Sequence, residues 1–437
     1  MPDGDLWSTG LLGKSLYLWL VLFAVTAAPA RAQDQADAAP RETSAASSVL
    51  FQPTLDAGDL WHVLRHGRAD PLAGDPGATA PTPGRNHFFV AAPTVASKPS
   101  TGLSVGLNSN LAFFTGDEKT THISSLSGGL RVSQKKQVLS GIRFGVFTAD
   151  DRWFIQGDNR LSWTSQNTYG LGADTAAIGS GIENVKFTAF KLYETAYRTV
   201  RPHLFVGGGI NTSTHSNIRP GDGVLETFDQ SAYAAYNERH GFGDDRQTSS
   251  GISAGLLFDT RDNGINAQRG WLASAALRTF FDGFLGGDST WQQLTIDVRT
   301  YRKLTPDGRR KLAFWFMSDN VLSGTAPYLD LPATGSDGRS ARGYSDGRYR
   351  GEHLVYGEME YRGTITSNGL LGYVAFLNAT TVDNADAGIK LFDDFAPAGG
   401  FGLRLLLNKH SRTNLTADYG WGKGGSRGLY LGIQEAF

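Results

Sequence analysis

The chain has 437 residues, of which 40% are hydrophobic and 11% aromatic, and it carries 55 glycines, no cysteine and a formal net charge of −1. The mean hydropathy of −0.26 is too low for a bundle of apolar membrane-spanning helices. The absence of cysteine excludes a disulfide framework and a thiolate metal site, and the balanced charge excludes the basic footprint of a nucleic-acid-binding protein.

The first element is an apolar stretch over residues 16–28, which is followed by the small-residue site Ala30-Arg31-Ala32. A helix of this length is too short to cross ~30 Å of hydrocarbon comfortably, and the small residues are typical of a signal-peptidase site. We therefore predict a signal peptide over residues 1–32, with a membrane anchor as the alternative. Export is the expected outcome.

Residues 33–85 are rich in Ala, Pro, Gly, Asp and Thr. This composition buries too little apolar surface to fold alone, and we predict a mostly disordered periplasmic arm. His62 and His66 stand one helical turn apart in the arm. Since no third ligand is apparent, we interpret them as an incidental exposed pair and expect neither a metal site nor a cofactor.

From residue 86 onward, polar and apolar residues alternate as they do along strands. In one such run Gln293, Thr295 and Asp297 oppose Leu294 and Ile296. An even number of strands is what a closed antiparallel barrel needs when both chain ends lie on one side. The sixteen predicted strands cover residues 86–97, 101–114, 121–133, 137–148, 152–165, 182–198, 201–215, 249–261, 269–282, 289–304, 309–323, 350–364, 369–381, 396–408, 411–422 and 427–437.

The connections between these strands alternate in length, with longer loops at 166–181, 216–248, 324–349 and 382–394. With the N-terminus in the periplasm, the short turns fall on the periplasmic side and the long loops outside. We predict an all-β fold, a sixteen-stranded antiparallel transmembrane β-barrel over residues 86–437 in the bacterial outer membrane, because a closed barrel satisfies every backbone group in lipid. A soluble secreted sandwich has the same period, but its long loops would not gather at one end.

A charged motif lies in the long Gly-rich loop after residue 323. Arg342-Gly343-Tyr344 is followed by a strand that carries Glu358 and Glu360 on one face. Several charges on a covered face fit a water-filled lumen and not a dry core. These residues resemble the BamA/TamA superfamily of outer-membrane barrels, also called bacterial surface antigens. The turn with Asp259, Arg261, Asp262 and Gly270 is similar to a periplasmic turn of the same family, and it is expected to fix hairpin geometry more than to contact a partner.

The resemblance implies that the loop folds into the lumen and that its arginine pairs with acidic groups of the wall, with a free surface loop as the alternative. The family places an Asp on the next strand, where this chain has Asn378. We therefore expect Glu360, with Glu358 or Asp418, to make the ionic pairs of Arg342.

Both ends of the barrel carry further signals. The last strand places Leu429, Leu431, Ile433 and the terminal Phe437 on one face, which looks like the signal that the barrel-assembly machinery reads during insertion. Pro93 lies in the first strand and cannot donate to a ladder, so it weakens the seam between the first and last strands unless the strand simply starts later. An opening seam is how the resembled insertases are thought to admit client strands.

The resemblance implies a barrel, surrounded by outer-membrane lipid, that assists the insertion, assembly or translocation of proteins or lipids. The space between Ala32 and Asn86 is too short for a POTRA domain, so we expect a short family member that recruits a client or periplasmic partner in trans. The alternative is a passive channel for small solutes. We expect no enzyme activity, because the Gly-x-Ser-x-Gly pattern around Ser253 lies in an alternating strand and not in a strand-turn-helix.

Overall fold

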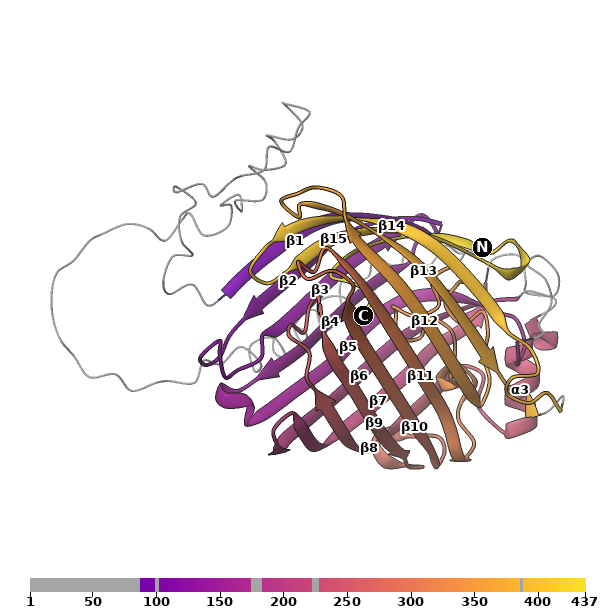
Figure 1. Ribbon diagram of the computed structural model, residues 1–437. Helices are drawn as coiled ribbons and strands as arrows, with labels where there is room; N and C mark the ends of the chain where they lie inside the picture. The colour runs from indigo at the N-terminus through magenta and orange to yellow at the C-terminus, as the bar shows by residue number, and fades with distance from the viewer. Residues whose placement is uncertain (1–86, 99–101, 174–182, 222–227, 386–387) are drawn as a thin grey trace, which may run out of the picture. The chain divides into compact units, whose positions relative to one another are not determined.

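The computed structural model describes residues 87–98, 102–173, 183–221, 228–385 and 388–437. The predicted signal peptide and arm lie outside these residues. Among the described residues, no helix is both long and apolar enough to cross a bilayer. Sixteen antiparallel strands close into one barrel, in which the indigo β1 meets the yellow C-terminal strands (Figure 1), and this confirms the predicted fold class.

The strands follow one another around the barrel in chain order. They are β1 (His87–Lys98), β2 (Gly102–Phe113), β3 (Ser124–Ser133), β4 (Val138–Phe147), β5 (Trp153–Thr168), β6 (Glu183–Arg201), β7 (Leu204–Pro220), β8 (Arg246–Asp259), β9 (Gly270–Phe280), β10 (Trp291–Lys303), β11 (Arg310–Gly324), β12 (His353–Thr364), β13 (Leu371–Val382), β14 (Ala396–Asn408), β15 (Thr413–Gly422) and β16 (Arg427–Ile433).

The alternation of the sequence sorts side chains between the two faces of the wall. On β13 and β14 the outward Leu377 and Leu403 are 64% and 61% exposed, whereas the inward Glu360 of β12 is fully buried inside the barrel. Apolar side chains outside and polar ones inside are the arrangement of a barrel in lipid.

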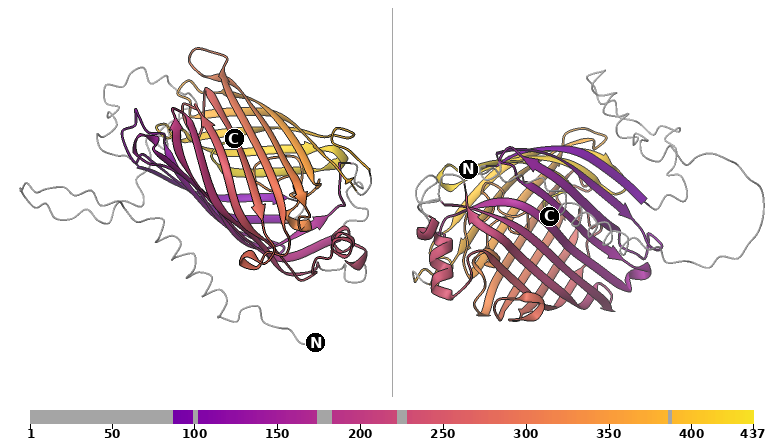
Figure 2. Two further views of the ribbon diagram at one scale, coloured as in Figure 1. Left: turned by 90° about the horizontal axis from the view of Figure 1, so that it is seen from below. Right: turned by 180° about the vertical axis from the view of Figure 1, so that it is seen from behind.

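The four long loops lie at one rim, as predicted, but the short connections that follow β1, β3 and β15 belong to the same rim. The sorting of connections by length is therefore less strict than the sequence indicated. We call this the outer rim and the opposite one the periplasmic rim. The loop between β7 and β8 also contains the helix α3 (Ala232–His240), which stands at the outer rim (Figure 2).

Helix α3 forms because its ends are well capped. The Ser231 hydroxyl accepts a hydrogen bond from the Ala234 N–H at 3.1 Å, and Gly241 takes a left-handed φ of 73° at the C-cap. Its Tyr233 and Tyr236 pack edge-on against Tyr328, at ring-centroid distances of 5.8 and 5.5 Å. The helix thus covers the first part of the loop between β11 and β12.

The seam between β1 and β16 is the weakest joint of the barrel. Within the described residues it has one register pair, Ser97↔Leu429, whereas β15 and β16 share seven. Pro93 lies in the middle of β1, opposite Leu107 of β2, so the alternative that the strand starts after Pro93 is wrong. The missing N–H of proline falls within the edge strand of this seam.

Strand β16 is shorter than the predicted range of 427–437, because it ends at Ile433. Gln434 takes a φ of 78°, which turns the chain out of the ladder. Phe437 consequently lies inside the barrel, 5% exposed, with its ring 5.2 Å from that of Trp315. Leu429, Leu431 and Ile433 remain on the strand, but Phe437 does not continue their face.

Candidate functional site

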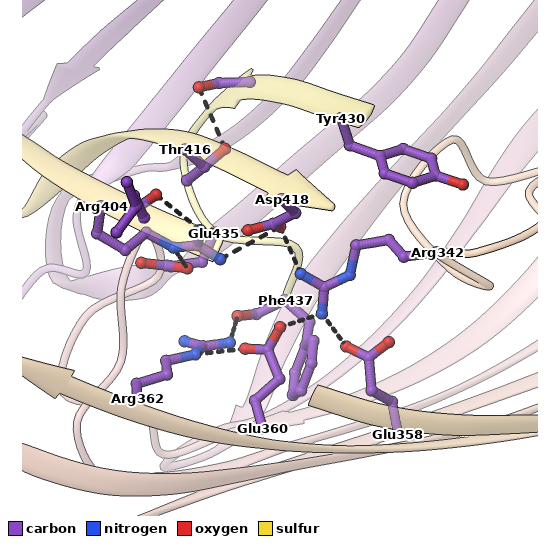
Figure 3. Close-up of polar contacts among 12 residues, drawn as sticks. Arg342, Glu358, Glu360, Arg362, Arg404, Thr416, Asp418, Tyr430, Glu435 and Phe437 are labelled. Atoms are coloured by element: carbon purple, nitrogen blue, oxygen red, sulfur yellow. Dashed lines mark hydrogen bonds and ion pairs between the residues drawn. The ribbon is translucent and has the colours of Figure 1, made fainter. Parts of the chain in front are cut away.

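Loop L6, which we define as residues 325–352 between β11 and β12, enters the lumen and brings Arg342 to the wall (Figure 3). The Arg342 Nη2 donates hydrogen bonds to Glu358 and Glu360 of β12, and its Nη1 donates to Asp418 Oδ2 of β15 at 2.5 Å. Three carboxylates from two strands thus surround one guanidinium. The two-residue period of β12 places both glutamates on its inner face.

Burial makes this cluster electrostatically strong. The side chains of Arg342, Glu358, Glu360 and Asp418 are between 0% and 6% exposed. The Arg342 guanidinium also lies 3.9 Å from the ring centroid of Phe376. Charges of opposite sign interact strongly when water is excluded, and a buried charge that loses its partner is costly.

Two further arginines extend the cluster to the end of the chain. Arg362 donates to Glu360 Oε2 at 2.5 Å and to the main-chain oxygen of Phe437 at 2.9 Å. Arg404 of β14 donates to Asp418 Oδ1 at 2.5 Å and to Glu435 at 2.7 Å. Figure 3 shows the resulting network, which joins L6 to β12, β14, β15 and the C-terminal residues.

Asn378 has a different role from the Asp that the resembled family has at this position. Its Nδ2 donates to the Arg342 carbonyl at 3.1 Å and to Glu358 Oε2 at 3.3 Å. The amide therefore holds the backbone of the motif, while the negative charge comes from Glu358, Glu360 and Asp418 together.

Gly343 and Tyr344 fix the loop against β14, β15 and β16. Gly343 has a φ of 112°, and a Cβ there would lie 2.8 Å from the Ala398 Cβ, so only glycine fits. The Tyr344 hydroxyl donates to the Pro397 carbonyl at 2.5 Å and accepts from the Lys423 N–H at 2.9 Å. The Tyr430 hydroxyl of β16 accepts from the Gly343 N–H at 2.9 Å and donates to the Tyr344 carbonyl at 3.0 Å.

Comparison with known families decides the assignment. The model of the Omp85 superfamily domain matches residues 211–437, which is more than half of the chain and includes the whole of L6. The chain belongs to the Omp85 superfamily. The family indicated by the Arg342-Gly343-Tyr344 motif is thereby confirmed, and the protein is an integral outer-membrane barrel.

Solved structures share the fold of this Omp85 barrel. BamA from Haemophilus ducreyi lacking POTRA domains 1–3 is 15% identical with a TM-score of 0.51, and the match covers 80% of this chain and 70% of that one. CdiB from Acinetobacter baumannii is 13% identical with a TM-score of 0.50, and the match covers 80% of this chain and 59% of that one. No curated protein matches the chain.

A second anchor holds L6 of the Omp85 barrel on the opposite wall. Arg160 of β5 donates to the Ser336 carbonyl at 2.8 Å and to the Asp337 carbonyl at 3.1 Å, and Arg143 of β4 also donates to the Asp337 carbonyl. Asp158 orients both arginines, with contacts of 3.1 Å to Arg143 and 2.6–2.8 Å to Arg160. Loop L6 therefore crosses the lumen from β4–β5 to β12–β15.

This second anchor was not predicted from the sequence. The alternation places Arg143, Asp158 and Arg160 on inner faces, which was the available signal. It could not say which loop the arginines contact, because Arg160 and Ser336 are 176 residues apart. The lumen beside L6 contains cavities of about 610 and 420 Å³, and both are lined by Arg143, Arg160 and Arg339.

The Asp259-Arg261-Asp262 turn of the Omp85 barrel lies at the periplasmic rim. Arg261 donates two hydrogen bonds to Asp259, at 3.0 and 2.7 Å. Gly270 has a φ of 106°, and a Cβ there would lie 2.3 Å from the Thr260 carbonyl oxygen. Asp262 accepts from the N–H groups of Gln268 and Arg269 at 2.8 and 3.2 Å. These bonds form the hairpin itself, which supports a geometric role for the turn.

The same turn also reaches across the periplasmic mouth. Arg412, in the turn after β14, donates to Asp262 at 2.9 Å, and Lys311 of β11 donates to the Ala267 carbonyl at 3.1 Å. Ile265 is buried against Ala112 and Ile123, at the periplasmic ends of β2 and β3. Burial opposes ionisation of Asp262, but its bonds to Arg412 and to the backbone lower its pKa below the ordinary value.

Proposed function

We propose that this Omp85 barrel assists the insertion, assembly or translocation of proteins at the outer membrane by exposing a strand edge at the β1–β16 seam. The observation that carries the proposal is the seam itself, which has one register pair, Ser97↔Leu429, among residues 87–98 and 427–433. A strand edge with few internal pairs leaves N–H and C=O groups that a client strand can occupy.

The contacts of L6 support a link between the loop and the seam. Tyr430 of β16 is hydrogen-bonded to Gly343 and Tyr344, and the C-terminal residues after β16 are bound by Arg362 and Arg404. The inward position of L6 therefore stabilises the position of β16. Movement of L6 would remove the two Tyr430 bonds from the strand that must separate from β1.

The position of L6 also favours assembly over the passive channel. The loop crosses the lumen and is anchored on both walls by Arg342, Arg143 and Arg160. A channel for small solutes needs a continuous water path with groups that bind and release the solute. Here Arg143 and Arg160 on the wall bind both Asp158 and the loop, and Glu358, Glu360 and Asp418 bind Arg342 of the loop.

A disulfide across the seam tests the proposal, because the natural chain has no cysteine. Ser97→Cys and Leu429→Cys place the two thiols on facing strands, where Cα atoms about 4.5–5.5 Å apart suit a disulfide. The matched control joins β2 and β3 through Val105→Cys and Val132→Cys, which are also register partners. Each pair is introduced in a strain whose only copy of the protein is the variant.

We expect the oxidised seam pair to deplete particular barrels or surface proteins from the outer-membrane proteome, as deletion of the protein would. Reduction should restore them, and the β2–β3 pair should have no effect. An unchanged proteome with the seam locked would contradict the proposal. If deletion also leaves the proteome unchanged but alters the uptake of small solutes, the barrel acts as a channel.

A further inference from the structure

Three metal-ligating side chains meet at the outer rim, away from the L6 cluster. They are Glu352, the last residue of L6, His353, the first of β12, and Asp383, which follows β13. One ligand atom from each lies within 4.8 Å of the other two. No metal site was expected from the sequence, in which Asp383 is 30 positions from His353 and 31 from Glu352.

Asp383 is the most buried of the three side chains. Asp383 is 7% exposed, and its Oδ1 accepts a hydrogen bond from the His353 N–H at 2.8 Å. Its Oδ2 is 3.9 Å from His353 Nε2, which is too far for a hydrogen bond. A largely buried carboxylate is thus held by one oxygen, while the other faces the imidazole across a gap.

The backbone around this gap is tightly packed. A Cβ on Gly351 would lie 2.4 Å from the Asp383 carbonyl oxygen and 2.8 Å from the Asp383 Oδ1. The end of L6 therefore packs against the start of the loop between β13 and β14. The Val321 N–H of β11 also donates to the Glu352 carbonyl at 2.8 Å. Three strand ends therefore fix the positions from which the side chains project.

We propose that Glu352, His353 and Asp383 bind a divalent transition-metal ion such as Zn²⁺, which would fasten the end of L6 to the β13 end. One imidazole and two carboxylates, with water in the fourth position, form a donor set that suits zinc. Ca²⁺ and Mg²⁺ instead take six or more oxygen ligands or retain most of their waters. The half-buried side chains of Glu352 and His353 can rotate to bring the ligand atoms to zinc distances.

The hydrogen bond that Asp383 Oδ1 accepts also suits such a site. The His353 N–H that donates it orients the carboxylate, as outer-shell donors commonly do for metal ligands. It leaves Oδ2 available to the ion. In Asp383→Asn the amide oxygen can still accept the hydrogen bond from the His353 N–H, while an uncharged NH₂ group replaces Oδ2. The variant therefore tests metal ligation with little change in the fold.

The test uses the full chain in detergent, freed of metal by a chelator, with bound zinc measured by equilibrium dialysis and mass spectrometry. His62→Ala and His66→Ala are included in every protein, to remove the only histidine pair at one-turn spacing in the arm. We expect one tightly bound zinc per chain. Asp383→Asn and His353→Gln should each weaken zinc binding at least about tenfold.

His410→Gln is the matched control, because His410 faces Glu118 at 3.2 Å and belongs to no group of three ligands among the described residues. It should leave zinc binding unchanged. Native gel mobility before and after heating checks that each variant still forms a barrel. Zinc binding that is indifferent to both Asp383→Asn and His353→Gln, or equal competition by Ca²⁺, would overturn the proposal.

Discussion

At the scale of single residues, Arg342 stands out because one guanidinium meets three carboxylates that are almost fully buried. A planar guanidinium has five N–H donors and can bind several acceptors at once, which a lysine cannot do with the same geometry. Glu360 is central to this arrangement, since it also binds Arg362, and Arg362 donates to the main-chain oxygen of Phe437. The charge of Glu360 therefore stabilises the positions of both L6 and the C-terminal residues.

Glu360→Gln should loosen L6 without unfolding the barrel. The amide keeps the shape of the side chain but removes the charge that Arg342 and Arg362 share, and a buried charge left short of its partner costs about 3–5 kcal/mol. We expect cleavage by proteinase K at L6, between residues 325 and 352, to become at least about tenfold faster.

The control for this experiment is Asp297→Asn. Asp297 pairs with Arg299 on the inner wall at 2.6 Å, and this pair lies outside the contacts that anchor L6. The variant should change the stability of the wall and leave the cleavage rate of L6 near that of the natural protein. Equal cleavage of L6 in Glu360→Gln and the natural protein would show that Glu360 does not hold the loop.

At the scale of elements, the sequence predicted the strands well because lipid outside and water inside impose one residue pattern on every strand. It predicted the ends of elements less well. The turn at Gln434 and the inward Phe437 depend on Trp315, Arg362 and Arg404, which lie on other strands. The alternation of residues within one strand does not predict contacts between side chains of different strands.

The same limit applies to the contacts between loops and walls. The partners of Arg342 could be named because a family resemblance supplied the loop's place in the lumen, and the inner-face pattern then left few acidic candidates. For Arg143 of β4 and Arg160 of β5, the resemblance named no contact. Helix α3 was missed because its capping residues, Ser231 and Gly241, lie in a region that was interpreted as loop.

The periplasmic turns are joined by an ion pair that responds to pH. His122, before β3, contacts Asp151, before β5, through its Nδ1 at 2.5 Å, with His203, Asp259 and Arg261 nearby. Burial lowers the pKa of His122, but the hydrogen bond and the charge of Asp151 outweigh it and raise the pKa above its ordinary 6.5. The protonated, paired form is thus favoured in the folded barrel.

Because the folded pKa of His122 is raised, its contribution to stability is fully present below the unfolded pKa and is lost as the pH rises through the folded pKa. We expect the melting temperature of the barrel to fall from about pH 6 to about pH 8 by more than it does in His122→Gln. Asp151→Asn, which keeps the acceptor for the His122 N–H, should lose the same pH dependence. Parallel pH profiles for the natural protein and both variants would exclude this pair as the cause.

At the scale of the whole molecule, L6 joins two halves of the barrel that are far apart in the chain. Its tip binds β4 and β5, while Arg342 and Tyr344 bind β12, β14 and β15. The seam lies in the shorter arc between these anchors, since β1 follows β16 and β2 follows β1 around the wall. A loop fastened on both sides of the seam resists the outward movement of β16 from β1.

Arg160→Ala therefore tests whether the far anchor contributes to holding the seam closed. The substitution removes two hydrogen bonds to L6 carbonyls, each worth about 1.5–3 kcal/mol when the donor is charged, while Asp158 keeps Arg143 and Lys191 as partners. We expect faster cleavage of L6 by proteinase K. In the background that carries Ser97→Cys and Leu429→Cys, we also expect slower disulfide formation between the two introduced thiols, because β1 and β16 spend less time paired.

Arg278→Ala is the matched control, since Arg278 lines the same cavity but donates to Gln293 and Thr295 of the wall. If Arg160→Ala frees the loop and the seam still oxidises at the natural rate, the tip of L6 and the seam are not coupled, and closure of β16 depends on the contacts at the other end of L6 and at the C-terminal residues.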